Sequence, residues 1–140
     1  MKLYLSIFIL ITLTFIVKAQ NLESELIIGR WGIQKDPMNK LDLFDSKYSF
    51  EFNKDNTFNI IKPVEGKHDS LRIDESGKYK LSKDSIEIII IQEDGINLTK
   101  PQSIKLKIIR LTKTELILQW PNMINQDGKN KYPELKFIKE

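Results

Sequence analysis

The sequence predicts an all-β fold: an antiparallel up-and-down β-barrel of about eight strands, with a short N-terminal helical turn. Three observations lead to this prediction. Apolar residues recur with a period of two along most of the chain after residue 29, as expected for strands with one buried face. Turn-forming residues separate these runs at short intervals. No helical pattern of useful length follows residue 29.

The N-terminal segment has the layout of a secretory signal peptide. Lys2 gives a positive start, residues 3–17 are almost entirely apolar, and Val17-Lys18-Ala19 provides a cleavage site. The apolar run of 15 residues is shorter than the roughly 17–25 that a membrane-spanning helix needs. We therefore expect a signal peptide over residues 1–19, cleavage after Ala19, export to the periplasm or the extracellular medium, and no stable membrane anchor afterwards. Residues 20–140 then form one domain.

Composition argues against several classes of function. The net charge of +3 at pH 7 includes Lys2 and Lys18, so the mature chain carries +1. Its basic residues are spread along the chain, and no nucleic-acid partner is expected. The chain has no cysteine and a single histidine, His68, so neither a disulfide nor a transition-metal site is expected. There is no glycine-rich phosphate loop, and no cofactor is expected.

Four acidic residues at turn-like positions are the remaining candidates for catalysis. They are Asp74, Glu75, Glu93 and Asp94. Nothing in their spacing selects an acid–base pair, and solvated loop residues are the ordinary case for such a pattern. The sequence therefore does not indicate an enzyme.

A helical turn and a first strand open the mature chain. Asn21 can cap a turn with acidic residues in its first positions, and Gly29 ends it. The first strand follows and carries Trp31. A tryptophan so early in a barrel is either an ordinary core residue or the plug of one barrel end.

Three hairpins and a closing strand follow. Residues 48–52 and 57–61 are joined by a turn in which Asn56 tolerates a positive φ. The remaining strands are 77–81 with 85–91, 103–111 with 114–120, and 134–139. Longer polar stretches are expected to be loops, at 36–46, 62–70, 92–101 and 121–132.

The strand at 85–91 is unusually apolar. Alternation places Ile86, Ile88 and Ile90 in the interior and leaves Ile89 and Ile91 on the outer face. The protein's own chain covers such a patch in the commoner case, and the alternative is a surface for a protein partner.

Four stretches resemble the small bacterial lipocalin-like domain proteins, which are related in form to the lipocalins and fatty-acid-binding proteins. Gly29-Arg30-Trp31 is similar to the Gly-x-Trp of the family's first strand. Residues 50–58 resemble its aromatic–turn–Phe hairpin, with Asn56 at the usual glycine. Residues 75–88 and 108–118 resemble its Gly-x-Tyr strand and its penultimate hairpin. The resemblance covers most of residues 26–120, and it implies a calycin-type barrel that binds an apolar small molecule.

The resemblance also implies a role for Trp31. In lipocalins the first-strand tryptophan packs across the closed end of the barrel, and an arginine from a late strand lies over it. Strict alternation from Ile104 places Arg110 on the apolar face of its strand, which makes Arg110 the candidate for that role. The alternative is a strand-end arginine whose guanidinium reaches water. A bulge in the strand would reverse the alternation.

A ligand would enter the barrel at the end away from Trp31, among the longer loops. The predicted pocket lining is Tyr48, Phe50, Ile60, Tyr79, Ile90 and Trp120. We expect an exported protein that binds a small apolar or amphiphilic molecule inside its barrel. The alternative is a filled barrel that acts as an inhibitor or accessory factor through its loops or the face of Ile89 and Ile91. An open cavity above roughly 300 Å³ favours the first function, and a packed interior favours the second.

Overall fold

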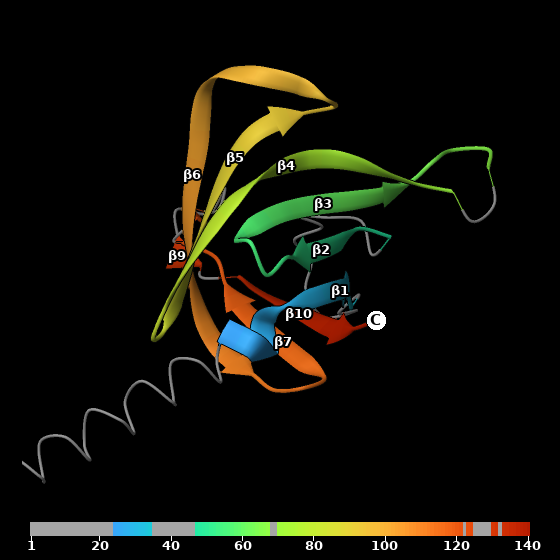
Figure 1. The fold of residues 1–140 in the computed structure, drawn as a ribbon. Coiled ribbons are helices and arrows are strands. Elements are labelled where there is room, and N and C mark those ends of the chain that lie inside the picture. Colours follow the sequence, from blue (N-terminus) through green and yellow to red (C-terminus); the bar gives the residue numbers. More distant parts are fainter. Residues whose placement is uncertain (1–23, 35–46, 68–69, 122, 125–129, 132) are drawn as a thin grey trace, which may run out of the picture.

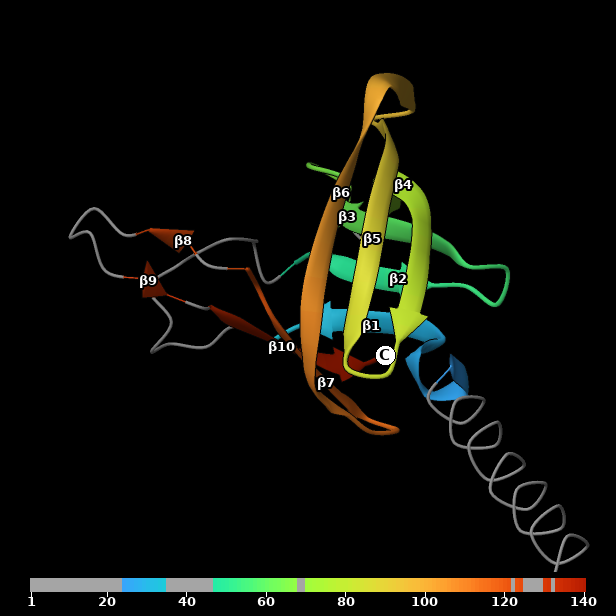
Figure 2. The ribbon, with the colours of Figure 1, turned by 90° about the vertical axis from the view of Figure 1, so that its left-hand side faces the viewer.

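The computed structural model describes residues 24–34, 47–67, 70–121, 123–124, 130–131 and 133–140. The strands, labelled in Figures 1 and 2, are β1 (Gly29–Ile33), β2 (Ser49–Phe52), β3 (Thr57–Pro63), β4 (Leu71–Ser82), β5 (Ser85–Glu93), β6 (Ile96–Leu111), β7 (Glu115–Gln119), β8 (Met123–Ile124), β9 (Asn130–Lys131) and β10 (Glu134–Lys139).

Eight of these strands form a closed barrel in the order β1-β10-β7-β6-β5-β4-β3-β2. All neighbouring pairs are antiparallel, and the barrel closes where β1 pairs with β10, with Trp31 opposite Lys139. Strands β8 and β9 form a separate two-stranded sheet, which Figure 2 shows to one side of the barrel. The predicted all-β, antiparallel up-and-down barrel is therefore confirmed.

A helical turn, Ser24–Ile27, precedes β1 as predicted. The proposed cap, Asn21, lies outside the described residues, as do residues 1–20 and the predicted loop at 36–46. The β2–β3 turn also matches the prediction, because Asn56 has a φ angle of 63°.

The prediction of a loop at 92–101 is wrong. Strand β5 runs to Glu93 and β6 begins at Ile96, and the connecting Asp94 and Gly95 have φ angles of 48° and 77°. Positive φ at both central residues is typical of the type I′ turn, whose twist matches that of paired strands. Figure 1 and Figure 2 show this hairpin extending well beyond β1 and β2.

Aromatic side chains from four strands pack together inside the barrel. The ring of Phe50 meets that of Phe58 edge-on, with centroids 5.3 Å apart, and lies 4.9 Å from Phe137. The ring of Phe52 lies 5.1 Å from those of both Phe58 and Tyr79. Such pairs add to the apolar burial that stabilises a core. The buried core comprises Ile27, Trp31, Ile33, Phe50, Phe52, Phe58, Ile60, Tyr79, Ile86, Ile88, Leu106, Leu116, Leu118, Leu135 and Phe137.

Several bulges interrupt the regular pairing of the strands. The register shifts occur at Ile60/Ile61, Ser76/Gly77, Ile90/Gln92 and Ile108/Arg110. Each shift moves the side chains that follow it to the other face of the sheet. At Gly77, an added Cβ would lie 1.9 Å from the carbonyl oxygen of Ile89. Only glycine therefore permits this approach of β4 to β5.

Candidate ligand-binding site

Trp31 closes one end of the barrel together with the N-terminal helical turn. The indole is fully buried, and its Nε1 donates a hydrogen bond of 2.7 Å to the carbonyl oxygen of Ile27. Ile27 is itself fully buried, so the turn that carries it covers this end. The ammonium of Lys139 lies 5.0 Å from the centre of the indole and donates to the carbonyl oxygen of Leu26 at 3.2 Å. This distance is within the range of a cation–π contact.

The predicted contact between Trp31 and Arg110 is wrong. The bulge at Ile108/Arg110 reverses the alternation on which that prediction depended. The Arg110 side chain is 61% exposed and binds Glu115 at 3.0 Å. The cation that lies over the indole is Lys139 of β10, because this residue is paired with Trp31 where β1 meets β10. The alternation of Leu135, Phe137 and Lys139 was the signal that could have identified it.

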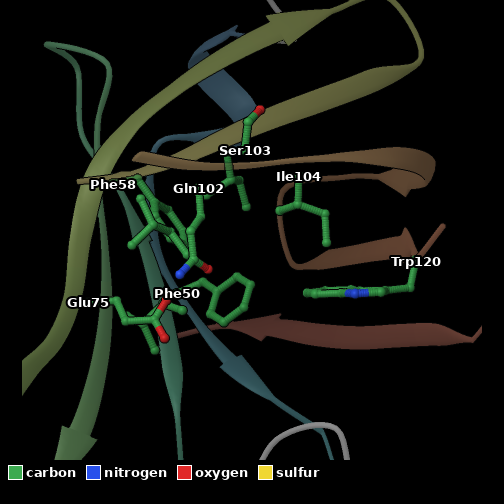
Figure 3. A pocket seen from close by; sticks show the side chains of 10 residues that line it. Phe50, Phe58, Glu75, Gln102, Ser103, Ile104 and Trp120 are labelled. Carbon is green, nitrogen blue, oxygen red and sulfur yellow. The ribbon is translucent and has the colours of Figure 1, made fainter. Parts of the chain in front are cut away.

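A cavity of about 340 Å³ lies inside the barrel, on the other side of the aromatic residues. Its lining is mostly apolar and comes from β2 to β6 and the residue after β7: Phe50, Phe58, Ile60, Glu75, Ile88, Ile90, Gln102, Ser103, Ile104 and Trp120. Figure 3 shows Glu75 and Gln102 reaching into the cavity from one side and the Trp120 ring from the other. The hydroxyl of Ser103 turns away and donates to Glu87 at 2.8 Å.

The structure brings four of the six predicted pocket residues around this cavity. They are Phe50, Ile60, Ile90 and Trp120. The other two lie elsewhere.

Tyr79 packs towards the closed end of the barrel, where its hydroxyl donates to the carbonyl oxygen of Asn53 at 2.9 Å. Tyr48 precedes β2 and lines a separate hollow of about 910 Å³ on the rim, beside Lys62 and Arg72. The assignment of Tyr48 and Tyr79 to the pocket is therefore wrong.

The two polar side chains of the pocket, Glu75 and Gln102, were missed by the sequence analysis. The sequence pattern indicates a turn at Glu75 and the edge of a loop at Gln102, but the two residues lie within the long strands β4 and β6. The signal was present in the alternation: Glu75 shares the parity of Tyr79, and Gln102 shares that of Leu106.

Burial raises the pKa of the Glu75 carboxyl, and the neighbouring Asp74 and Glu93 raise this pKa further. Lys62 opposes that shift, but its ammonium forms an ion pair with Asp74. Removing a carboxylate from water disfavours its charged form, as does a like charge nearby. Glu75 is therefore a partly buried carboxyl in a site that lacks a cation of its own.

No known protein family and no curated protein matches this chain. The proposal for the function therefore rests on the geometry of the pocket. Among the described residues, no group of three or more His, Cys, Asp or Glu side chains is placed to hold a metal ion. In the same part of the chain, no helix is long and apolar enough to cross a membrane. His68 lies outside the described residues.

Ile89 and Ile91 of β5, the residues predicted to form an outer apolar patch, are both half-buried. Among the described residues, the most exposed large apolar side chains lie on other parts of the barrel. They are Leu71 (54%), Ile73 (53%), Ile96 (72%), Ile109 (42%) and Ile138 (41%).

Proposed function

We propose that this protein is an exported, lipocalin-like binding protein that holds a small apolar or amphiphilic molecule inside its barrel. The observation that carries the proposal is the cavity of about 340 Å³, which falls within the usual size range of ligand sites. Its apolar walls can enclose a hydrocarbon body, and the half-buried Trp120 contributes an apolar ring to them. The position of Trp31 at the opposite end supports the resemblance to lipocalins. The proposal involves no catalysis.

Titration with the neutral fluorescent probe N-phenyl-1-naphthylamine tests this function. We expect a saturable rise in emission at one probe per chain. Ile90→Trp places a larger side chain in the cavity and should abolish the signal, and Ile104→Phe should weaken it. Ile73→Trp adds the same indole at an exposed site and is the matched control, which should bind as the native protein does.

Circular dichroism and the urea midpoint establish that each variant is folded. Absence of saturable binding to the native protein would contradict the ligand-binding function. So would equal binding by a folded Ile90→Trp and by Ile73→Trp, because the probe would then be held outside the cavity.

A second candidate function is an interaction with a protein partner at the rim of the barrel. Leu71 and Ile73 on β4 and Ile96 at the start of β6 are more than half exposed, at 54%, 53% and 72%. Leu71 and Ile73 lie two residues apart on the same strand, and neighbouring exposed apolar residues are typical of interaction sites. This candidate would become the better account if the native protein binds no probe.

A further inference from the structure

We propose that the pocket selects amphiphiles with a cationic head group, such as an alkylammonium, and that the Glu75 carboxylate is the counter-ion of this head. The inference rests on the proposed ligand-binding function and names the ligand class. It follows from the position of Glu75, the charges around it and the size of the cavity.

Glu75 lies on the inner face of the barrel. It is paired with Ile60 of β3 and with Glu93 of β5, and Ile60 also lines the cavity. In Figure 3 its carboxylate and the amide of Gln102 reach into the cavity from the same side. A head group placed there would meet two hydrogen-bond acceptors, the carboxylate and the amide oxygen. Its apolar body would extend towards Trp120.

The charges around the cavity favour a cation. Glu75 is the one charged residue in the lining, all of which is described. Three further carboxylates and two cations surround it on β3, β4, β5 and the β5–β6 turn: Asp74, Glu93, Asp94, Lys62 and Arg72.

Both of these cations already have carboxylate partners. Lys62 pairs with Asp74, and Arg72 pairs with Asp94 at 2.9 Å. When all four carboxylates are ionised, the group carries two negative charges in excess. A carboxylate head group would be repelled here, and an ammonium would be attracted.

The Glu75 carboxylate also lacks a partner among the described residues. None of them donates a hydrogen bond to it or forms an ion pair with it. A bound ammonium would supply both interactions in a setting that is partly shielded from water, where charge-assisted hydrogen bonds are stronger than neutral ones.

The volume suggests a length for the test compounds. A group the size of a water molecule occupies about 30 Å³ in the liquid, so a cavity of about 340 Å³ holds roughly eleven such groups. A ten-carbon chain with a one-atom head matches this number. Decylammonium, decanol and decanoate therefore form a test series with the same chain and a head that is positive, neutral or negative.

Displacement of N-phenyl-1-naphthylamine by these three compounds tests the inference at pH 7, with the two ionic compounds below their micellar concentrations and decanol below its solubility limit. We expect decylammonium to bind at least about tenfold more tightly than decanol, as a charge-assisted hydrogen bond allows, and decanoate to bind more weakly than decanol. Glu75→Gln should bring the ratio of ammonium to alcohol affinity close to one. Glu87→Gln, on the outer face beside Ser103, should leave the ratio unchanged.

The outcomes separate this inference from the proposed function. If the native protein binds neither the probe nor any of the three compounds, the ligand-binding function itself fails. If decanoate binds as tightly as decylammonium, the function stands and the charge preference is wrong. If a folded Glu75→Gln keeps the native ratio, Glu75 is not the counter-ion and the inference is overturned.

Discussion

The ammonium of Lys139 lies 5.0 Å from the centre of the Trp31 ring, and it joins the last barrel strand to the first across the closed end. The same ammonium donates to the carbonyl oxygen of Leu26 in the turn that covers the indole. Lys139 therefore ties three parts of the closed end together: β1, β10 and the helical turn.

Lys139→Met should lower the free energy of unfolding by about 1–2 kcal/mol, because the cation–π contact and one hydrogen bond are lost while the apolar stem remains. Arg110→Met is the matched control. Its exposed ion pair with Glu115 should contribute less, because water screens the two charges. Urea unfolding followed by circular dichroism measures both, and a larger loss for Arg110→Met would contradict this assignment of the two cations.

Trp31→Ala should destabilise the protein by about 3–5 kcal/mol, the range for removing a large aromatic side chain from a core. The indole is fully buried and its Nε1 bonds to Ile27, so the substitution leaves both a cavity and an unpaired carbonyl oxygen. Ile138→Ala removes a side chain that is 41% exposed and should cost much less. Equal shifts of the two urea midpoints would show that Trp31 does not anchor the closed end.

Gly77→Ala should destabilise the barrel by about 1–3 kcal/mol or more, because the new methyl group overlaps the backbone of the adjacent strand. The added Cβ would lie 1.9 Å from the Ile89 carbonyl oxygen. Lys80→Ala, at an exposed position of the same strand, is the control and should change stability little. A Gly77→Ala protein with native stability would mean that the bulge relaxes without cost.

Glu75→Gln should become progressively more stable than the native protein as the pH rises from 4 to 8. The pKa of Glu75 is raised in the folded protein, chiefly by burial and then by Asp74 and Glu93. The native protein therefore has the full stabilising contribution of protonated Glu75 below the unfolded-state pKa of about 4.3. It loses this contribution as the pH rises through the folded-state pKa. Urea unfolding at several pH values measures the difference between the two proteins.

The opposite pH dependence is expected for Glu115→Gln, which serves as the control for Glu75→Gln. Hydrogen bonds from Lys136 and then Arg110 lower the pKa of Glu115. Its stabilising contribution is present above the unfolded-state pKa and is lost as the pH falls through the folded-state value. The variant should therefore be less stable than the native protein at neutral pH, by an amount that shrinks in acid. The same sign of change for both variants would contradict these two shifts.

Export should leave a mature N-terminus at Gln20. Residues 1–19 have the layout of a cleavable signal peptide, and we expect cleavage after Ala19. Intact-mass spectrometry of the protein recovered from the cell envelope or the medium measures the terminus directly. Recovery there of a chain that still begins at Met1 would contradict the proposed cleavage.

The positions of the strands could be predicted from the sequence, because the inward-facing apolar side chains of a strand recur at every second residue. The alternation of Phe50 and Phe52, of Phe58 and Ile60, and of Leu116 and Leu118 is visible without knowledge of the partner strand. The general position of the pocket follows from the same alternation, since four of its residues were identified in this way.

The bulges could not be predicted, because a register shift depends on the partner strand as well as on the strand that carries it. This is why Arg110 was placed on the wrong face. The hairpin at 92–101 was missed for another reason. It extends beyond the barrel, where polar residues are tolerated on both of its faces. Pro101 also lies in a part of β6 that is not paired with β5, so the missing N–H of proline costs no hydrogen bond there.

The pairing of β1 with β10 has a consequence for how the chain folds. The contact between Lys139 and Leu26 spans 113 residues, so the barrel cannot close until synthesis has passed Lys139. Contacts between such distant residues slow folding, since a long loop must be ordered before they form. During that interval β1 keeps an open edge, and an export machinery that accepts unfolded chains would have time to act before the polypeptide becomes compact.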